Sequence, residues 1–333
     1  MGRDGGAARG LRRGYFGHNE SGIVSTLFLT HPAGLAHAMP DGHPERTDRL
    51  ATILEALRPD EFAGLVRGQA PMADEAELMR GHDAGYIATL RAARPETGRV
   101  QLDGDTFMGP AAWEAALRAV GGAGAAVDAA LAGAAANGFV AMRPPGHHAE
   151  RDRPMGFCLF GTVAIAAKRA LDHHGLGRVA VLDFDVHHGN GTQDILWDDR
   201  RAMVVSSHQM PLYPGTGHAH ETGAHGQIVN LPLVPGSGGR EMRAAWQVAL
   251  AKVMLFRPEL ILVSAGFDAH RNDPLGGLNW TEADFAWLTH AICDLADECC
   301  QGRVVSSLEG GYDLGALAAS VAAHVGVLME RGE

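Results

Sequence analysis

Two carboxylates and an imidazole alternate along one short segment of this chain, as Asp183, Asp185 and His187. The segment follows an apolar, β-branched run, and an extended backbone there would turn all three side chains to the same side. A further carboxylate, Asp268, follows another apolar run. A single Asp after a strand ordinarily caps a helix or loop, but several buried carboxylates repel one another without a cation. Two Asp and one His can hold a divalent ion and leave a coordination position for water, as catalytic zinc requires.

Two further polar segments also follow apolar runs and complete a possible hydrolytic site. His147 and His148 stand on a loop stiffened by proline and glycine, where one imidazole could act on a water and the other on a developing oxyanion or leaving amine. Tyr312 follows two glycines, and its phenol could donate a hydrogen bond to the oxyanion of an acyl-transfer intermediate. Taken alone, each segment could equally be an inert surface histidine or a tyrosine packed on a turn.

Strands and helices alternate along the chain, which favours an α/β fold with a parallel sheet covered by helices on both faces. The pattern predicts strands at residues 23–29, 138–142, 179–184, 203–206, 228–231, 260–264 and 304–308, and helices at 110–131, 162–173, 239–256, 281–300 and 314–329. The polar segments follow predicted strands, where chemistry gathers in such sheets. Residues 1–22 are rich in Gly and Arg, so we expect a flexible extension there. No linker divides the rest of the chain, so we expect a single catalytic domain at residues 23–333.

Composition limits the partners and the compartment. The net charge of the 333 residues is −11 and no basic stripe is present, which argues against direct binding of nucleic acid. The four cysteines form no spaced Cys-x-x-Cys pair, which indicates a reducing compartment. The longest N-terminal apolar run is too short for a membrane span, so we expect a cytoplasmic protein without membrane contact.

Together these segments resemble the histone deacetylase and acetylpolyamine amidohydrolase family, and in particular its class II-like bacterial members. The resemblance implies the arginase-deacetylase fold, a single domain around a mostly parallel sheet of about eight strands. It extends over residues 27–327 and rests on several blocks in the family's order: residues 43–46 (His-Pro-Glu-Arg), 143–149 (Arg-Pro-Pro-Gly-His-His-Ala), 156–158 (Gly-Phe-Cys), 183–193, 214–217 (Pro-Gly-Thr-Gly), 264–268 and 309–312.

The resemblance also implies roles for individual residues. Asp185, His187 and Asp268 would bind one Zn²⁺. His148 would be the general base, His147 its electrostatic or acid partner, and Tyr312 the oxyanion donor. Asp183 would orient His147, and Asn190 would lie behind His148, where many relatives have aspartate.

Two monovalent-ion sites are implied in the same way. Structural K⁺ would lie next to zinc, held by Asp183, Ser206 and Ser207 with the carbonyls of Asp185 and His187. A second such site would lie near Leu196, Asp199 and Ala202.

The resemblance further implies a channel for the acyl group. Phe157, beside Gly156, and Tyr213 would be its aromatic walls, and Leu275 would lie at its rim. Asp105 would hold the substrate backbone there.

The predicted activity is zinc-dependent hydrolysis of an acylated amine, with release of acetate from acetyl-lysine in a protein or from a small acetylated amine such as an acetylpolyamine. One alternative is a binuclear manganese ureohydrolase, which shares the fold. That enzyme needs further carboxylates, but Gly189 and His270 stand two residues after His187 and Asp268. A second alternative is a non-catalytic acyl-lysine binding protein, which loss of the base or of the oxyanion residue would favour, and neither is lost. The sequence does not decide the substrate, the length of the acyl chain or the oligomeric state. A homo-oligomer therefore stays open.

Overall fold

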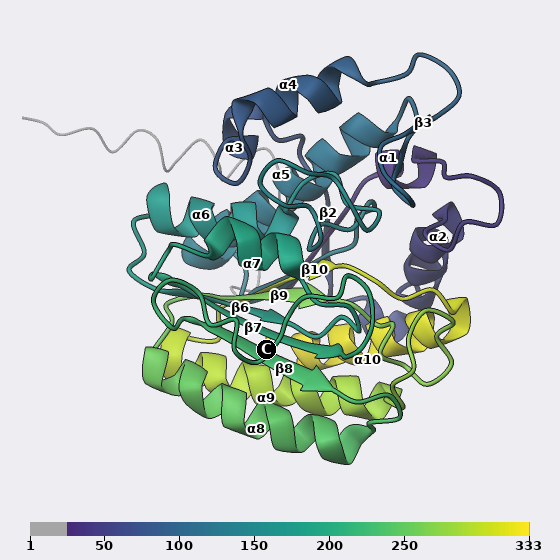
Figure 1. Cartoon of the computed structure of the whole chain (residues 1–333). Helices are drawn as coiled ribbons and strands as arrows, with labels where there is room; N and C mark the ends of the chain where they lie inside the picture. The colour runs from purple at the N-terminus through teal and green to yellow at the C-terminus, as the bar shows by residue number, and fades with distance from the viewer. Residues whose placement is uncertain (1–24, 333) are drawn as a thin grey trace, which may run out of the picture.

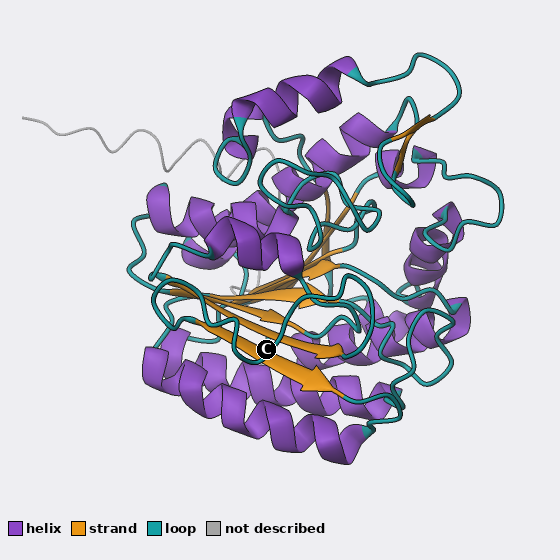
Figure 2. Ribbon diagram, viewed as in Figure 1, coloured by secondary structure: helices purple, strands orange, loops and turns teal. Residues whose placement is uncertain are grey.

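The computed structural model describes residues 25–332, and the predicted extension at residues 1–22 lies outside them. An eight-stranded sheet in the order β2-β1-β5-β10-β9-β6-β7-β8 forms its centre, and each neighbouring pair is parallel (Figure 2). The strands are β1 (Thr26–Thr30), β2 (Val66–Gln69), β5 (Asn137–Val140), β6 (Val179–Asp183), β7 (Ala202–Gln209), β8 (Ile228–Leu233), β9 (Ile261–Ala265) and β10 (Val304–Leu308). The predicted α/β class and parallel sheet are confirmed.

Helices cover both faces of this sheet (Figure 1). On one face lie α8 (Gly239–Phe256), α9 (Glu282–Cys300) and α10 (Leu314–Glu330), and on the other lie α5 (Ala112–Leu131), α6 (Thr162–Asp172) and α7 (Asn190–Leu196). Successive residues of β6 enter different cores, since Ala180 and Leu182 pack on the α8–α10 side and Val179 and Val181 on the α5–α7 side. Burial on both faces explains why β6 is apolar from Val179 to Leu182.

Shorter elements complete the described chain. They are α1 (Pro32–Ala36), α2 (Thr47–Ala56), the 3-10 turn η2 (Asp60–Phe62), α3 (Glu75–Leu78), α4 (Ala84–Ala92) and an antiparallel pair of β3 (Val100–Gln101) with β4 (Phe107–Met108). The edge strand β2 was not predicted, because its sequence Val-Arg-Gly-Gln is partly exposed and has little β character. Within residues 25–332, no helix is long and apolar enough to cross a membrane.

Local signals fix the ends of the helices near the site. A capping box is present at Thr281, since the Thr281 backbone N–H donates to Asp284 Oδ2 at 2.9 Å and α9 begins at the next residue. At the start of α10, the Asp313 carboxylate accepts a hydrogen bond from the Ala316 backbone N–H at 2.8 Å. The helix that follows Tyr312 therefore starts at a defined place.

The topology brings distant segments together. Strands β5, β10, β9 and β6 are consecutive neighbours in the sheet, although β5 and β10 are far apart in the chain. Their carboxyl ends lead into the segments that carry His147 and His148, Tyr312, Asp268 and Asp185 respectively. All these segments therefore meet at one edge of the sheet, the usual place for a site in this class of fold.

Candidate active site

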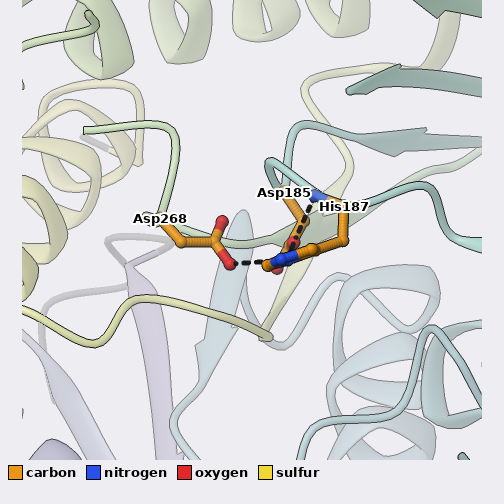
Figure 3. A group of neighbouring side chains, drawn as sticks. All are labelled: Asp185, His187 and Asp268. Atoms are coloured by element: carbon orange, nitrogen blue, oxygen red, sulfur yellow. Dashed lines mark hydrogen bonds and ion pairs between the residues drawn. The ribbon is translucent and has the colours of Figure 1, made fainter. Parts of the chain in front are cut away.

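Asp185, His187 and Asp268 converge on one point beyond β6 and β9 (Figure 3). The His187 Nδ1 atom lies 3.1 Å from Asp185 Oδ1 and 3.2 Å from Asp268 Oδ2, and all three side chains are buried. Backbone N–H groups turn the carboxylates toward this point, because Val186 donates to Asp268 Oδ1 at 2.8 Å and Gly310 donates to Asp185 Oδ2 at 2.8 Å. The arrangement presents one nitrogen and two oxygen atoms from a fixed frame.

The electrostatics of this group favour a cation. Burial alone would lower the pKa of His187, but hydrogen bonds to Asp185 and Asp268 outweigh it and raise the pKa to about 10. The same field that retains a proton attracts a divalent ion, and these donor types are those of catalytic zinc sites. The Gly310 backbone packs directly against both carboxylates, since a Cβ there would lie 2.0 Å from Asp268 Oδ2 and 2.6 Å from Asp185 Oδ2. The three residues therefore fit a bound zinc ion.

His147 and His148 lie beside this group, with ring centroids 4.0 Å apart. The His147 Nδ1 atom lies 3.0 Å from Asp183 Oδ2, and the His148 Nδ1 atom lies 2.7 Å from Asn190 Oδ1. The Asn190 amide nitrogen donates to Glu150 Oε1 at 2.7 Å, so its oxygen is the atom that faces His148. His148 Nδ1 must then carry the hydrogen, which leaves the Nε2 lone pair free to accept a proton.

The two imidazoles differ in charge. Burial lowers the pKa of His148 well below its usual value, and the neighbouring His147 and His187 add to this effect. Burial would also lower the pKa of His147, but the Asp185 and Asp183 carboxylates outweigh it and hold that pKa well above the usual value. The two shifts have opposite directions and favour a neutral His148 and a protonated His147, an arrangement that acid–base catalysis can use.

Tyr312 is buried and is held through its backbone and its ring. Its N–H donates to Asp273 Oδ2 at 2.6 Å, the Arg49 guanidinium lies 4.8 Å from its ring centroid, and the Phe157 ring packs edge-on at 5.9 Å. Burial raises its pKa well above the usual value, and Asp268 raises it further while Arg49 opposes the change. The phenol therefore keeps its proton and can act as a hydrogen-bond donor.

The predicted channel residues lie around the same group. The Tyr213 ring packs edge-on against His148 at 5.2 Å and is 39% exposed, so it lies at the surface end of the site. Gly156 has a φ of +54°, and a Cβ there would lie 2.3 Å from His148 Cδ2, so only glycine fits against that imidazole. The Phe157 N–H donates to Thr106 Oγ1 at 3.0 Å, which ties Phe157 to the residue after Asp105.

The two remaining rim residues are fixed by backbone contacts. The carbonyl of Asp105 lies 3.1 Å from His43 Nε2, while the Asp105 carboxylate is half-buried and accepts a hydrogen bond from Thr106 Oγ1 at 3.2 Å. Leu275 donates its backbone N–H to Asp273 Oδ1 at 2.9 Å. Asp273 therefore joins the loop that carries Leu275 to the backbone of Tyr312.

The residues predicted to hold K⁺ are also placed. Asp183 and Ser206 are register partners on β6 and β7, and the Asp183 Oδ1 atom accepts the Asp185 N–H at 3.1 Å. The Ser207 hydroxyl accepts a hydrogen bond from Trp246 Nε1 at 3.1 Å on the α8 side, so it faces away from the Ser206 side chain.

At the second predicted ion site, the backbone N–H of Ala202 donates to the carbonyl of Asp199 and that of Asp199 to the carbonyl of Leu196. The Asp199 carboxylate is already paired with Lys168 at 2.8 Å and with Arg201 at 2.8 Å. The Asp199 side chain is therefore held by cations, and an ion here would use the backbone carbonyls instead.

A buried ion-pair network supports the site and was not predicted. Glu45 is fully buried between Arg49 and Arg143, and the Arg49 Nη1 atom lies 3.0 Å from Glu45 Oε1. The Arg49 Nε–H donates to the carbonyl of Gly311 at 2.6 Å, and Arg143 Nη1 donates to the carbonyl of Gly34 at 2.8 Å. The network therefore joins the segment before Tyr312 to the segment before the histidine pair.

Comparisons with known proteins agree with this geometry. Residues 43–328 match the histone deacetylase domain family. The chain is 40% identical to "Histone deacetylase 10, chloroplastic" of Oryza sativa subsp. japonica, over 89% of this chain and 71% of that one. It is 39% identical to "Histone deacetylase-like amidohydrolase" of Pseudomonas aeruginosa, over 84% and 74% respectively. A solved structure described as the HDA15 HD domain superposes with a TM-score of 0.87 at 33% identity, covering 92% of this chain and 88% of that one.

An α/β sheet with a two-aspartate, one-histidine group at its carboxyl edge and a histidine pair beside it defines a metal-dependent amidohydrolase class. Within that class, the chain belongs to the histone deacetylase family, a family of deacetylases and amidohydrolases. The predicted family and fold are therefore confirmed.

Proposed function

We propose that this protein is a zinc-dependent deacetylase that hydrolyses the amide of an acylated amine. The observation that carries the proposal is the hydrogen bond from His148 Nδ1 to Asn190 Oδ1 beside the Asp185, His187 and Asp268 group. It leaves a neutral imidazole nitrogen free as a base next to three metal-binding atoms.

Asp185, His187 and Asp268 would hold the zinc ion. The chemistry that a bound zinc ion supplies is Lewis-acid polarisation of a carbonyl and a lower pKa for water. His148 Nε2 takes the proton of the attacking water, and His147, held by Asp183, supplies positive charge and a proton for the leaving amine. Tyr312 donates a hydrogen bond to the acyl oxygen as negative charge develops on it.

We further propose that K⁺ binds near Asp183, Ser206 and Ser207, with the carbonyls of Asp185 and His187. Ser207 would contribute its backbone carbonyl, because its hydroxyl faces α8. Neutral or singly charged oxygen donors suit a weakly hydrated monovalent ion at such a place. The ion would stabilise the segment after β6 from the side away from the substrate. Measuring stability and activity in K⁺ and in a large organic cation of equal ionic strength tests this assignment.

The substrate reaches the site past aromatic rings. Phe157 and Tyr213 would form the walls of an acyl channel, with Gly156 and Leu275 beside them, while Asp105 would accept hydrogen bonds from the substrate backbone. Acetyl-lysine of a protein and a small acetylated amine both fit this description. The cytoplasmic location stays a prediction, since two relatives are named as chloroplastic.

The structure gives a reason to prefer this reaction to that of a binuclear manganese ureohydrolase. A second ion would need a carboxylate at position 189, where a Cβ on Gly189 would lie 2.3 Å from Asp183 Oδ2. A larger side chain therefore does not fit there. The position two after Asp268 is His270, a buried residue that accepts a hydrogen bond from the Asn272 N–H at 3.1 Å.

The deciding experiment is a substrate panel on one purified sample with its metal content measured. Acetyl-lysine peptides, acetylpolyamines and longer acyl-lysines are assayed before chelation, after chelation and after adding back zinc. We expect about one zinc ion per chain, loss of turnover on chelation and recovery with zinc. Two manganese ions per chain, or binding of acyl-lysine without turnover at any metal content, would contradict the proposal.

A further inference from the structure

We propose that Glu309 is a positioning residue for the loop that carries His147 and His148, and that it acts by accepting hydrogen bonds rather than through its charge. This inference rests on the proposed function only in so far as that function uses the two histidines. Glu309 directly follows β10 and has no assigned role in the site described above.

The carboxylate of Glu309 is fully buried, and both of its oxygens accept hydrogen bonds. Oε2 accepts the backbone N–H of Gly146 at 2.6 Å and that of His147 at 3.1 Å. Oε1 accepts the hydroxyl of Ser264, on β9, at 3.3 Å. One side chain thus joins the ends of three neighbouring strands, β5, β10 and β9, below the histidine pair.

Two consecutive N–H groups on one oxygen fix the peptide unit between Gly146 and His147, and with it the direction of the His147 side chain. The other side of the loop is also held. A Cβ on Gly146 would lie 2.8 Å from the carbonyl oxygen of Phe160 and 2.8 Å from the Thr162 nitrogen. At Gly146 the loop therefore contacts both Glu309 and residues 160–162.

The carbonyl that follows is fixed to α7. The oxygen of His147 accepts hydrogen bonds from the N–H groups of Gly191 and Thr192, at 3.0 and 3.1 Å. These residues directly follow Asn190, which holds the His148 ring. Glu309 holds the peptide unit before His147, and α7 holds the peptide unit after it. Both units that flank His147 are therefore fixed, and α7 alone fixes only the second.

Glu309 also ties this loop to the metal-binding group. The next residue, Gly310, donates its N–H to Asp185 Oδ2 at 2.8 Å. Glu309 and Gly310 therefore set the spacing between the histidine pair and Asp185, and that spacing decides whether a base reaches its proton.

Three substitutions separate hydrogen bonding from charge. Glu309→Gln keeps an acceptor oxygen at the same reach and removes the charge. Glu309→Asp keeps the charge but shortens the side chain by one methylene, which withdraws the acceptor. Glu309→Met keeps the length of the side chain but has neither the charge nor an acceptor oxygen. We expect kcat near the wild-type value for Gln and a loss of about 10–100-fold for Asp and Met, the usual effect of removing a partner behind a metal site. KM should change little, because Glu309 is fully buried behind the histidine loop.

The Gln and Asp variants decide the question even if the Met variant does not fold. Asp active and Gln impaired would overturn the proposal in favour of a charge effect, and wild-type kcat in both Asp and Met would overturn any positioning role. A matched control is Thr289→Val, which removes a buried hydrogen bond to His324 Nδ1 (2.7 Å) between α9 and α10. It should lower stability and leave kcat unchanged.

A second measurement does not depend on turnover. Hydrogen exchange of the peptide covering residues 143–149 should be slow in the wild type and in Glu309→Gln, and faster in Glu309→Asp and Glu309→Met. Equal exchange in all four proteins would refute the positioning role. Should the wild type hydrolyse no acylated amine, the proposed function fails, while the exchange data still decide whether Glu309 holds this loop.

Discussion

Replacing Asn190 by aspartate should move the acid limb of the pH–rate profile. In the structure, Asn190 Oδ1 lies 2.7 Å from His148 Nδ1 and is neutral. A carboxylate there favours the protonated imidazole, and an opposite charge at such a distance shifts a pKa by about 1–3 units. That corresponds to about 1.4–4 kcal/mol between the two protonation states.

The sign follows from the role of His148. Its pKa is lowered well below the usual value, chiefly by burial, so the base stays neutral until the solution is clearly acidic. When that pKa rises, the base becomes protonated at a higher pH and activity is lost earlier as the pH falls. The acid limb of kcat/KM against pH should therefore move upward by about 1–3 units in Asn190→Asp.

The assay needs a second substitution, because the Asn190 amide also donates to Glu150 Oε1 at 2.7 Å. An aspartate would bring two carboxylates together, raise its own pKa and weaken the effect on His148. Glu150→Gln restores a donor, so the double variant is the cleaner test and Glu150→Gln alone is the control with an unchanged limb. A folded double variant with the wild-type acid limb would refute the assignment of His148 as the base.

Three further substitutions, and a control at Gly133, test other parts of the site. Tyr312→Phe should lower kcat by about 10²–10³-fold, or about 2.7–4 kcal/mol, while metal content stays unchanged. Gly133→Ala should lose about 1–2 kcal/mol of stability at its positive φ, and Gly156→Ala should lose more, because a steric clash adds to the same backbone cost. Only Gly156→Ala should also lose kcat, because its Cβ would overlap His148 whereas nothing lies within 4 Å at Gly133. Glu45→Gln should lower the free energy of unfolding by about 3–5 kcal/mol in denaturant titrations, since it breaks pairs with two buried arginines.

Much of the candidate site could be predicted because its residues directly follow strands. Asp185 and Asp268 come after apolar runs, and the carboxyl ends of parallel strands share one edge of a sheet. The convergence of segments 80 or more residues apart then needs only that their strands be close neighbours, which β6 and β9 are. The strand order itself has no signal in the local pattern.

The buried charges could not be predicted for a different reason. Glu45 and Arg49 lie four residues apart where α2 begins, a spacing typical of an exposed helical pair. Their burial depends on Gly311 and Arg143, which only the tertiary structure brings close. Glu309 and Asp273 belong to the same group, since nothing local shows that their carboxylates accept backbone N–H groups from other loops.

The position of β10 has a consequence for how the chain folds. This strand is the last one along the described chain, yet it lies between β5 and β9, in the middle of the sheet. Until it enters, strands β2, β1 and β5 form one fragment and β9, β6, β7 and β8 another, each with an open hydrogen-bonding edge. We therefore expect folding to be slow and governed by contacts of long sequence separation, with the two fragments prone to aggregate until the insertion of β10 joins them.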